Sequence, residues 1–289
     1  MRSLPCTTTD SEVISYMIVQ QRLKTGSIES AVSAAMEVIE GGCNVQFALD
    51  PHSFQYYVIE VNPRSSRTVP FLSKSTGYSL ADIATEVILG KSLKEQGIFQ
   101  LYPEEKQRYY VKVPVFSFQK IKGLDAYLSP EMKSTGEAIG YDKSLSRAMY
   151  KALVAAGTKV QNYGTVIVTL ADEDKEEAVP LIRRFYNLGF NIEATDLTAK
   201  TMREHGIKTR TLRKLSEGSN QLLDALRAGH VAYLINTRAI LSGVHYEDGT
   251  AIRRTAIENG VTIFTSLDTV RVLLDVLEET TLTISTIDA

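Results

Sequence analysis

From Gly164 onward, short apolar segments alternate with amphipathic helical segments, and this alternation restricts the fold more than any other feature of the chain. Apolar runs of strand length predict strands at 164–171, 191–196, 207–213, 230–237 and 261–266. Helical periodicity predicts helices at 173–189, 198–206, 219–229, 249–260 and 267–279. Such alternation produces parallel strands joined by helical crossovers. We therefore expect an α/β domain with a mostly parallel five-stranded sheet over residues 157–289.

The preceding part of the chain has a different pattern. Alternating apolar residues predict strands at 44–50 and 56–63, and the turn-forming "PHSFQ" between them predicts an antiparallel hairpin. A further strand is expected at 109–118, where Pro114 favours an edge position. Helices are expected at 28–40, 79–90 and 144–157. We expect an α+β region over 36–156, preceded by a weakly patterned segment at 1–35.

The bulk composition excludes several classes of protein. The chain has 32 basic and 34 acidic residues, and no basic block that would indicate a nucleic-acid partner or a membrane surface. No apolar run reaches the length of a membrane span, and no signal-peptide core is present near the start. Two cysteines, Cys6 and Cys43, are usual in a reduced cytosolic protein. The composition predicts a cytoplasmic location.

Four polar residues of the hairpin suggest a metal–phosphate site. If the two strands pair, Gln46 and Glu60 lie on neighbouring strands, and Asn62 shares a face with Glu60. Carboxylate and amide oxygens suit Mg²⁺, which usually keeps phosphate oxygens as its other ligands. Arg64 follows at the strand end, where a guanidinium can hold a phosphate. The alternative is a half-exposed strand with ordinary surface polar residues.

A second set of polar residues follows the predicted parallel strands. Open α/β sheets bind ligands at the carboxyl ends of their strands, and helix N-termini there attract anions. The candidates for a phosphate or nucleotide site are Thr169, Lys175, Thr195, Thr198, Lys214, Asn236 and Thr237. The alternative for each threonine is a helix cap, which is the usual role of Thr at a helix start.

The first part of the chain resembles a known family. The strings "GGCNVQFALDP", "YYVIEVNPRSSRTVPFLSKSTGYSLADIATEVILGKSL", "VKVPVFSF" and "LSPEMKSTGEAIG" resemble the end of an ATP-grasp module in the carbamoyl phosphate synthetase large subunit. The resemblance implies that Gln46, Glu60 and Asn62 hold Mg²⁺ or Mn²⁺ on the phosphates of the substrate ATP. It also implies a catalytic role for Arg64 against those phosphates during phosphorylation of carbamate.

The second part is similar to the regulatory domain of the same family. The similarity lies in "TVIVTLADEDKEEAV", "LGFNIEATDLTAKTMREHGI", "LRKLSEG", "YLINT" and "IRRTAIENGVTIFTS". The resemblance implies a methylglyoxal synthase-like fold and assigns the seven strand-end residues to an effector nucleotide, UMP or IMP. The sequence departs from the family pattern at several positions, and "EGSNQ" lacks the Arg-Pro that commonly follows. Leu197 replaces a glycine, Asp196 adds a negative charge near the expected phosphate, and Arg238 replaces a small hydroxyl residue.

The resemblance also implies partners and an activity. The family is an ATP-dependent ligase whose large subunit works with a glutaminase small subunit, and its product enters pyrimidine and arginine synthesis. Because much of the ATP-grasp module is missing from this chain, we expect it to need the remainder of the large subunit and to be inactive alone. Two alternatives stay open. One is a non-catalytic nucleotide-sensing module, and the other is a methylglyoxal synthase-like lyase, although "KLSEGSNQLLD" lacks the expected Gly-Gly-Asp signature.

Overall fold

The computed structural model describes residues 43–62, 64, 66–100, 106–118, 125–128, 132–237 and 246–282. The chain divides into two compact units, residues 1–106 and 107–289. The helix expected at 28–40 lies outside the described residues. The domain boundary expected near residue 157 stays a prediction, because a division into compact units does not locate the border between two family domains.

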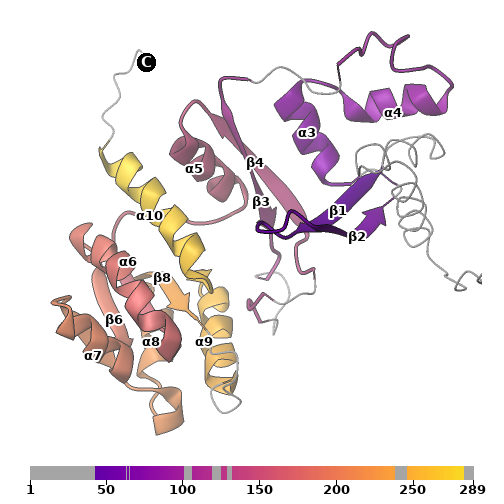
Figure 1. Ribbon diagram of the computed structural model, residues 1–289. Coiled ribbons are helices and arrows are strands. Elements are labelled where there is room, and N and C mark those ends of the chain that lie inside the picture. The colour runs from indigo at the N-terminus through magenta and orange to yellow at the C-terminus, as the bar shows by residue number, and fades with distance from the viewer. Residues whose placement is uncertain are drawn as a thin grey trace, which may run out of the picture. The chain divides into compact units, whose positions relative to one another are not determined.

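The first unit contains the expected hairpin. Strands β1 (Asn44–Leu49) and β2 (Tyr56–Asn62) pair in antiparallel register, with a bulge between Gln46 and Phe47 (Figure 1). Helix α4 (Leu80–Ile88) follows Ser79 as expected. Helix α3 (Thr68–Thr76) is an addition to the sequence-based prediction. Its Pro70 occupies the first turn, where the missing N–H costs no helical hydrogen bond.

The second unit begins with another two-stranded antiparallel sheet. Strand β3 (Tyr109–Val115) was expected, whereas its partner β4 (Gly136–Asp142) was not. Helix α5 (Leu145–Ala155) packs on β4, and the Ser144 hydroxyl caps it by accepting from the Arg147 N–H at 3.4 Å. Glycine is rare in strands, so β4 has a weak sequence signal. At Gly140 the reason for glycine is steric, because a Cβ atom there would lie 2.1 Å from the Ala148 carbonyl oxygen.

The remainder of the second unit is the expected α/β domain. Its five strands run in the order β7-β6-β5-β8-β9, and every pairing is parallel. The strands are β5 (Thr165–Thr169), β6 (Asn191–Thr195), β7 (Thr209–Leu212), β8 (Val231–Asn236) and β9 (Thr262–Phe264). The helices are α6 (Lys175–Asn187), α7 (Asp196–Glu204), α8 (Gln221–Arg227), α9 (Tyr246–Glu258) and α10 (Leu267–Leu282). The sequence-based prediction of these elements is confirmed.

Alternation along the central strand β5 divides the core into two layers. Val166 and Val168 pack with α6, α7 and α10, whereas Ile167 packs on the opposite face with α8 and α9. The chain leaves β5 through β6 and β7 on one side and returns to β8 on the other. This reversal of strand order opens a crevice at the carboxyl ends of the strands, which is where such sheets bind ligands.

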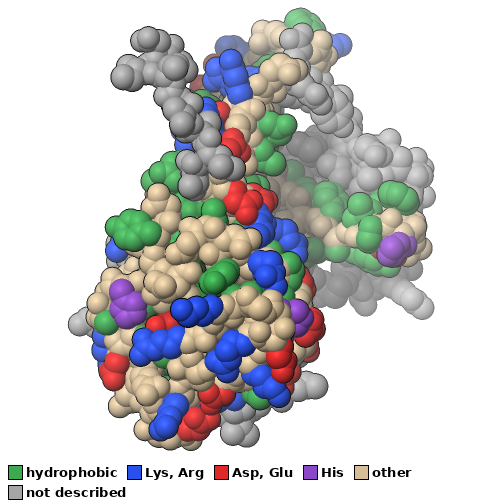
Figure 2. Space-filling view, turned by 90° about the vertical axis from the view of Figure 1, so that its left-hand side faces the viewer, with side chains coloured by type: hydrophobic (Ala, Val, Ile, Leu, Met, Phe, Trp, Pro, Cys, Tyr) green, Lys and Arg blue, Asp and Glu red, His purple; other side chains and the backbone are tan. Residues whose placement is uncertain are grey.

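The described surface reflects the balanced charge of the chain. Basic and acidic side chains lie intermixed on the face drawn in Figure 2, and the formal net charge is −2. Within the described ranges, no helix has both the length and the hydropathy that crossing a bilayer requires.

Candidate functional site

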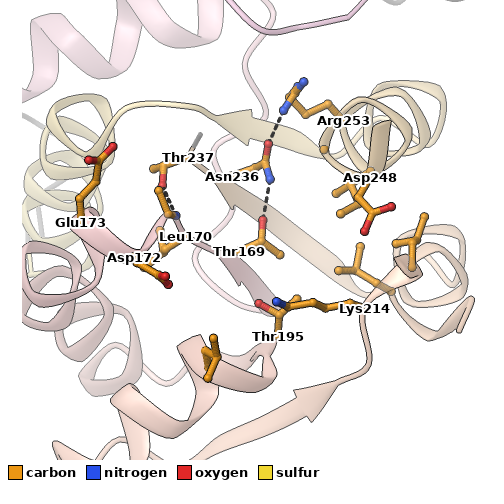
Figure 3. A pocket seen from close by; sticks show the side chains of 16 residues that line it. Thr169, Leu170, Asp172, Glu173, Thr195, Lys214, Asn236, Thr237, Asp248 and Arg253 are labelled. Carbon is orange, nitrogen blue, oxygen red and sulfur yellow. Dashed lines mark hydrogen bonds between the residues drawn. The ribbon is translucent and has the colours of Figure 1, made fainter. Parts of the chain in front are cut away.

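A cavity of about 490 Å³ opens at the carboxyl ends of the parallel strands (Figure 3). Its polar lining includes five of the seven residues that we expected in a phosphate site: Thr169, Thr195, Lys214, Asn236 and Thr237. Its apolar lining includes Leu197, Leu215, Leu222 and Ile252. The cavity therefore offers hydrogen-bond donors and a cation beside apolar side chains.

The other two expected residues do not line the cavity. Lys175 opens α6, but its ammonium pairs with the Asp172 carboxylate at 2.5 Å, and it is Asp172 that reaches the cavity. Thr198 lies in the first turn of α7 and is buried. Its hydroxyl has no hydrogen-bond partner within the described part of the chain, which is uncommon for a buried polar group.

The threonines at the start of α7 do not act as caps. Thr195 occupies the N-cap position, yet its side chain makes no capping hydrogen bond. The Thr198 hydroxyl is also unused. Neither threonine therefore caps the N–H groups at this helix end, where the Asp196 carboxylate also lies in the first turn. The capping alternative does not account for Thr195 or Thr198.

Lys214 and Arg253 are the two cationic residues among the described residues that line the cavity. Lys214 lies between β7 and the short 3₁₀ turn Leu215–Glu217 and is partly buried. Across the described ranges, its ammonium has no carboxylate partner. A partly buried lysine without a counter-ion is a suitable partner for a phosphate.

Asn236 and Thr169 are held by a buried hydrogen-bond chain (Figure 3). The Asn236 amide nitrogen donates to the Thr169 hydroxyl at 2.7 Å, and the Asn236 carbonyl oxygen accepts from Arg253 at 2.6 Å. The neighbouring Thr237 hydroxyl accepts from the Ala171 N–H at 3.0 Å. These contacts fix the orientation of the polar side chains before any ligand enters.

Sequence reasoning missed several residues of the cavity, including Asp172, Glu173, Asp248 and Arg253. For Arg253 a signal was present. Arg253 lies next to Ile252 and three residues before Ala256, both of which are buried. It therefore lies beside the apolar face of its helix, where a charged residue is rare unless it is paired. Glu173 and Asp248 follow no comparable pattern.

The departures from the family pattern can be placed in part. Leu197 lines the cavity with 52% of its surface exposed, so it narrows the site without filling it. Asp196 is exposed and is absent from the cavity lining, which weakens the expectation that its charge opposes a phosphate. Arg238 lies outside the described residues.

The hairpin brings together the predicted metal-binding residues. Gln46 lies directly opposite Glu60 in the strand register, and residues so paired share one face of a sheet. The Asn62 amide nitrogen donates to one Glu60 carboxylate oxygen at 2.9 Å, which leaves the other carboxylate oxygen and both amide oxygens for a cation. Arg64 is exposed just after β2. This donor set suits a hard divalent cation.

Two family models match the chain. Residues 17–96 match the model described as carbamoyl-phosphate synthase L chain, ATP binding domain, and residues 177–265 match the MGS-like domain. The first match contains the four predicted residues of the hairpin, and the second contains most of the cavity. The chain therefore contains part of an ATP-binding domain of the carbamoyl-phosphate synthase large chain followed by an MGS-like domain, as in the C-terminal portion of that large chain.

Proposed function

We propose that the α/β domain is an allosteric nucleotide-binding domain that takes UMP or IMP in the cavity at the carboxyl ends of its strands. The observation that carries this proposal is the convergence of Thr169, Thr195, Lys214, Asn236 and Thr237 on one cavity. These residues lie at or just after the carboxyl ends of four different strands. Convergence of this kind is expected of a ligand site and is not required by any helix cap.

The size and chemistry of the cavity support a nucleoside monophosphate. Pockets for ligands of this size measure roughly 300–1,000 Å³, and this cavity measures about 490 Å³. Lys214 and the Thr195 hydroxyl suit the phosphate, because they offer a cation and a donor that caps no helix. Leu215, Leu222 and Ile252 suit the apolar faces of a base.

For the hairpin we propose a role in the synthetase reaction. Gln46, Glu60 and Asn62 would hold Mg²⁺ or Mn²⁺ on the phosphates of ATP, and Arg64 would lie against those phosphates during phosphorylation of carbamate. A divalent cation bound there offsets the charge of the phosphates. The pairing of Gln46 with Glu60 supports this proposal. The activity belongs to the assembled enzyme, with the remainder of the large subunit and a glutaminase small subunit as partners. Among the residues that the structure describes, Cys43 is a free thiol, which is in keeping with a cytoplasmic location.

Calorimetric titration of the chain with UMP, IMP and Mg-ATP tests the proposal. We expect UMP or IMP to bind, and Lys214→Ala to abolish or strongly weaken that binding. Lys208→Ala is the matched control, because Lys208 is exposed just before β7, at the opposite end of that strand from Lys214. A folded chain that binds neither nucleotide would refute the proposed allosteric site. Nucleotide binding without turnover favours a sensing module over a lyase.

A further inference from the structure

Arg253 connects the cavity to a segment far away in the sequence. It lies on α9 with only 2% of its surface exposed, and it is among the largest fully buried side chains described. On one side it donates to Asn236 in the cavity wall. On the other side its Nε and Nη2 atoms donate to the two carboxylate oxygens of Asp125, each at 2.5 Å. Asp125 belongs to the connection between β3 and β4 and does not line the cavity.

The chemistry of arginine gives this chain of hydrogen bonds a direction. A guanidinium only donates, so the atom of Asn236 that faces Arg253 must be the oxygen, and the amide nitrogen must face Thr169. The Thr169 hydroxyl therefore accepts from Asn236, and its own proton must go elsewhere. Its other contact is long, 3.4 Å to the Ile235 carbonyl oxygen. Arg253 thus presents Thr169 to the cavity as a donor, which is the role that an anionic ligand requires.

Asp125 is the counter-ion that stabilises the buried guanidinium of Arg253. A buried arginine that loses its partner carries a large desolvation cost, whereas a two-pronged carboxylate pair offsets it. Asp125 also accepts from the Tyr127 N–H at 3.0 Å and from the Thr250 hydroxyl at 3.1 Å. The Tyr127 ring lies 5.5 Å from the guanidinium carbon. The segment 125–128 is therefore tied to Arg253 by charge, hydrogen bonds and a ring contact.

The ionisation of Asp125 agrees with this arrangement. Burial by itself would raise the pKa of Asp125, but the hydrogen bonds from Arg253 and the Tyr127 N–H, together with the guanidinium charge, hold its pKa below the usual value. The carboxylate is therefore charged at neutral pH and keeps its hold on Arg253.

We infer that Asp125 is a positioning residue for the nucleotide cavity, and that the hydrogen-bonded series Asp125–Arg253–Asn236–Thr169 couples occupancy of the cavity to residues 125–128. This inference rests on the proposed nucleotide site. Coupling between two sites is reciprocal. If a bound nucleotide stabilises the contacts of residues 125–128 through Thr169 and Asn236, then a change that breaks those contacts weakens nucleotide binding by the same factor.

The test compares Asp125→Asn with the unaltered chain. Asparagine keeps the shape of aspartate and one acceptor oxygen but removes the charge. We expect the affinity for UMP or IMP, measured by calorimetry, to fall about tenfold, within the usual range of coupling between sites. Hydrogen exchange supplies a second readout. The Tyr127 amide should exchange more slowly in the presence of UMP in the unaltered chain, and this slowing should disappear in Asp125→Asn.

The matched control is Asp142→Asn. It removes the carboxylate of the Asp142–Lys151 pair, which lies in the same compact unit and has no contact with the cavity lining. Its affinity for UMP should stay within twofold of the unaltered chain.

Each outcome separates the inference from the proposed function. If the unaltered chain binds neither UMP nor IMP, the nucleotide site is refuted and the coupling with it. If UMP binds equally well to both chains and leaves Tyr127 exchange unchanged, the coupling is wrong and the nucleotide site stands. If Asp125→Asn does not fold, as judged by circular dichroism, the exchange of Tyr127 in the unaltered chain with and without UMP decides the question.

Discussion

Replacement of Gly140 by alanine should separate α5 from β4. An ideal Cβ atom at Gly140 would lie 2.1 Å from the Ala148 carbonyl oxygen and 2.4 Å from the Ala152 backbone nitrogen. Carbon and oxygen atoms in contact normally stay about 3.3 Å apart. The interface would therefore have to open by about 1 Å or more. The atoms that clash belong to a helix backbone, so no side-chain rotation can relieve the contact.

The magnitude follows from what the interface buries. Ala148 and Ala152 are fully buried against the strand, and opening the interface would remove that packing. Inserting a methyl group into a well-packed interior costs about 1–3 kcal/mol and occasionally more. Because the clash is with backbone atoms, we expect the upper end, about 3 kcal/mol of the free energy of unfolding.

Gly136→Ala is the matched control for this prediction. Gly136 lies four residues earlier on the same strand, and its Cβ atom would meet only Val115, at 3.7 and 4.0 Å. That is ordinary contact, so alanine there should change stability by less than about 1 kcal/mol, in the stabilising direction, by restricting the unfolded chain.

Urea denaturation followed by circular dichroism compares the two variants, and hydrogen exchange of residues 136–155 locates the change. If Gly140→Ala and Gly136→Ala unfold at the same urea concentration, the steric explanation for glycine at position 140 is refuted.

Two further predictions concern buried and paired side chains. The Tyr233 hydroxyl donates to the Gln161 carbonyl oxygen and accepts from the Gln161 N–H, both at 2.7 Å, so Tyr233→Phe should lower the free energy of unfolding by about 1–3 kcal/mol in urea denaturation. Burial raises the pKa of Tyr233 to about 12, above the unfolded value of about 10. The stability that the protonated hydroxyl contributes is therefore fully present below the unfolded value and should be lost as pH rises through about 12. A difference in stability between Tyr233→Phe and the unaltered chain that stays constant over this range would contradict the assignment. Hydrogen bonds from Lys151 and the Ser144 N–H lower the pKa of Asp142 to about 2, so Asp142→Asn should lower the free energy of unfolding at neutral pH. The loss should stay below about 1 kcal/mol, because Lys151 is 54% exposed and solvent screens the pair. This cost should be present above pH 4 and vanish as pH falls through 2, and a cost that persists at pH 2 in the same assay would refute it.

Sequence periodicity predicted those elements whose own residues contain the signal. The strands β5 and β8 are short, mainly apolar runs, and β6 lies between two helical segments. The predicted bounds of all three differ from the observed bounds by only a residue or two. The elements α3 and β4 were missed because their local signals point elsewhere. Pro70 and the Ser/Thr content of α3 are typical of loops, and Gly136 and Gly140 disfavour a strand. The reason for glycine at position 140 appears only in the packing of α5 against β4, which leaves no room for a Cβ atom.

The candidate site divides in the same way. The position of a residue at the end of a parallel strand predicts the edge of the sheet at which it lies, so Thr169, Thr195 and Asn236 were expected to meet, and they line one cavity. The position of Lys175 at a helix start does not reveal that its ammonium turns to Asp172. That choice depends on side-chain packing.

The sequence by itself determined the class of fold, the order of its strands and helices, and most of the polar residues of the cavity, because each of these depends on local periodicity or on position along a strand. Only the tertiary structure decided that Asp125 and Arg253, 128 residues apart, form one buried ion pair behind Asn236. No local pattern encodes such a contact. It arises because Asp125 lies beside Arg253 of α9, where a buried guanidinium is stable only with a carboxylate beside it.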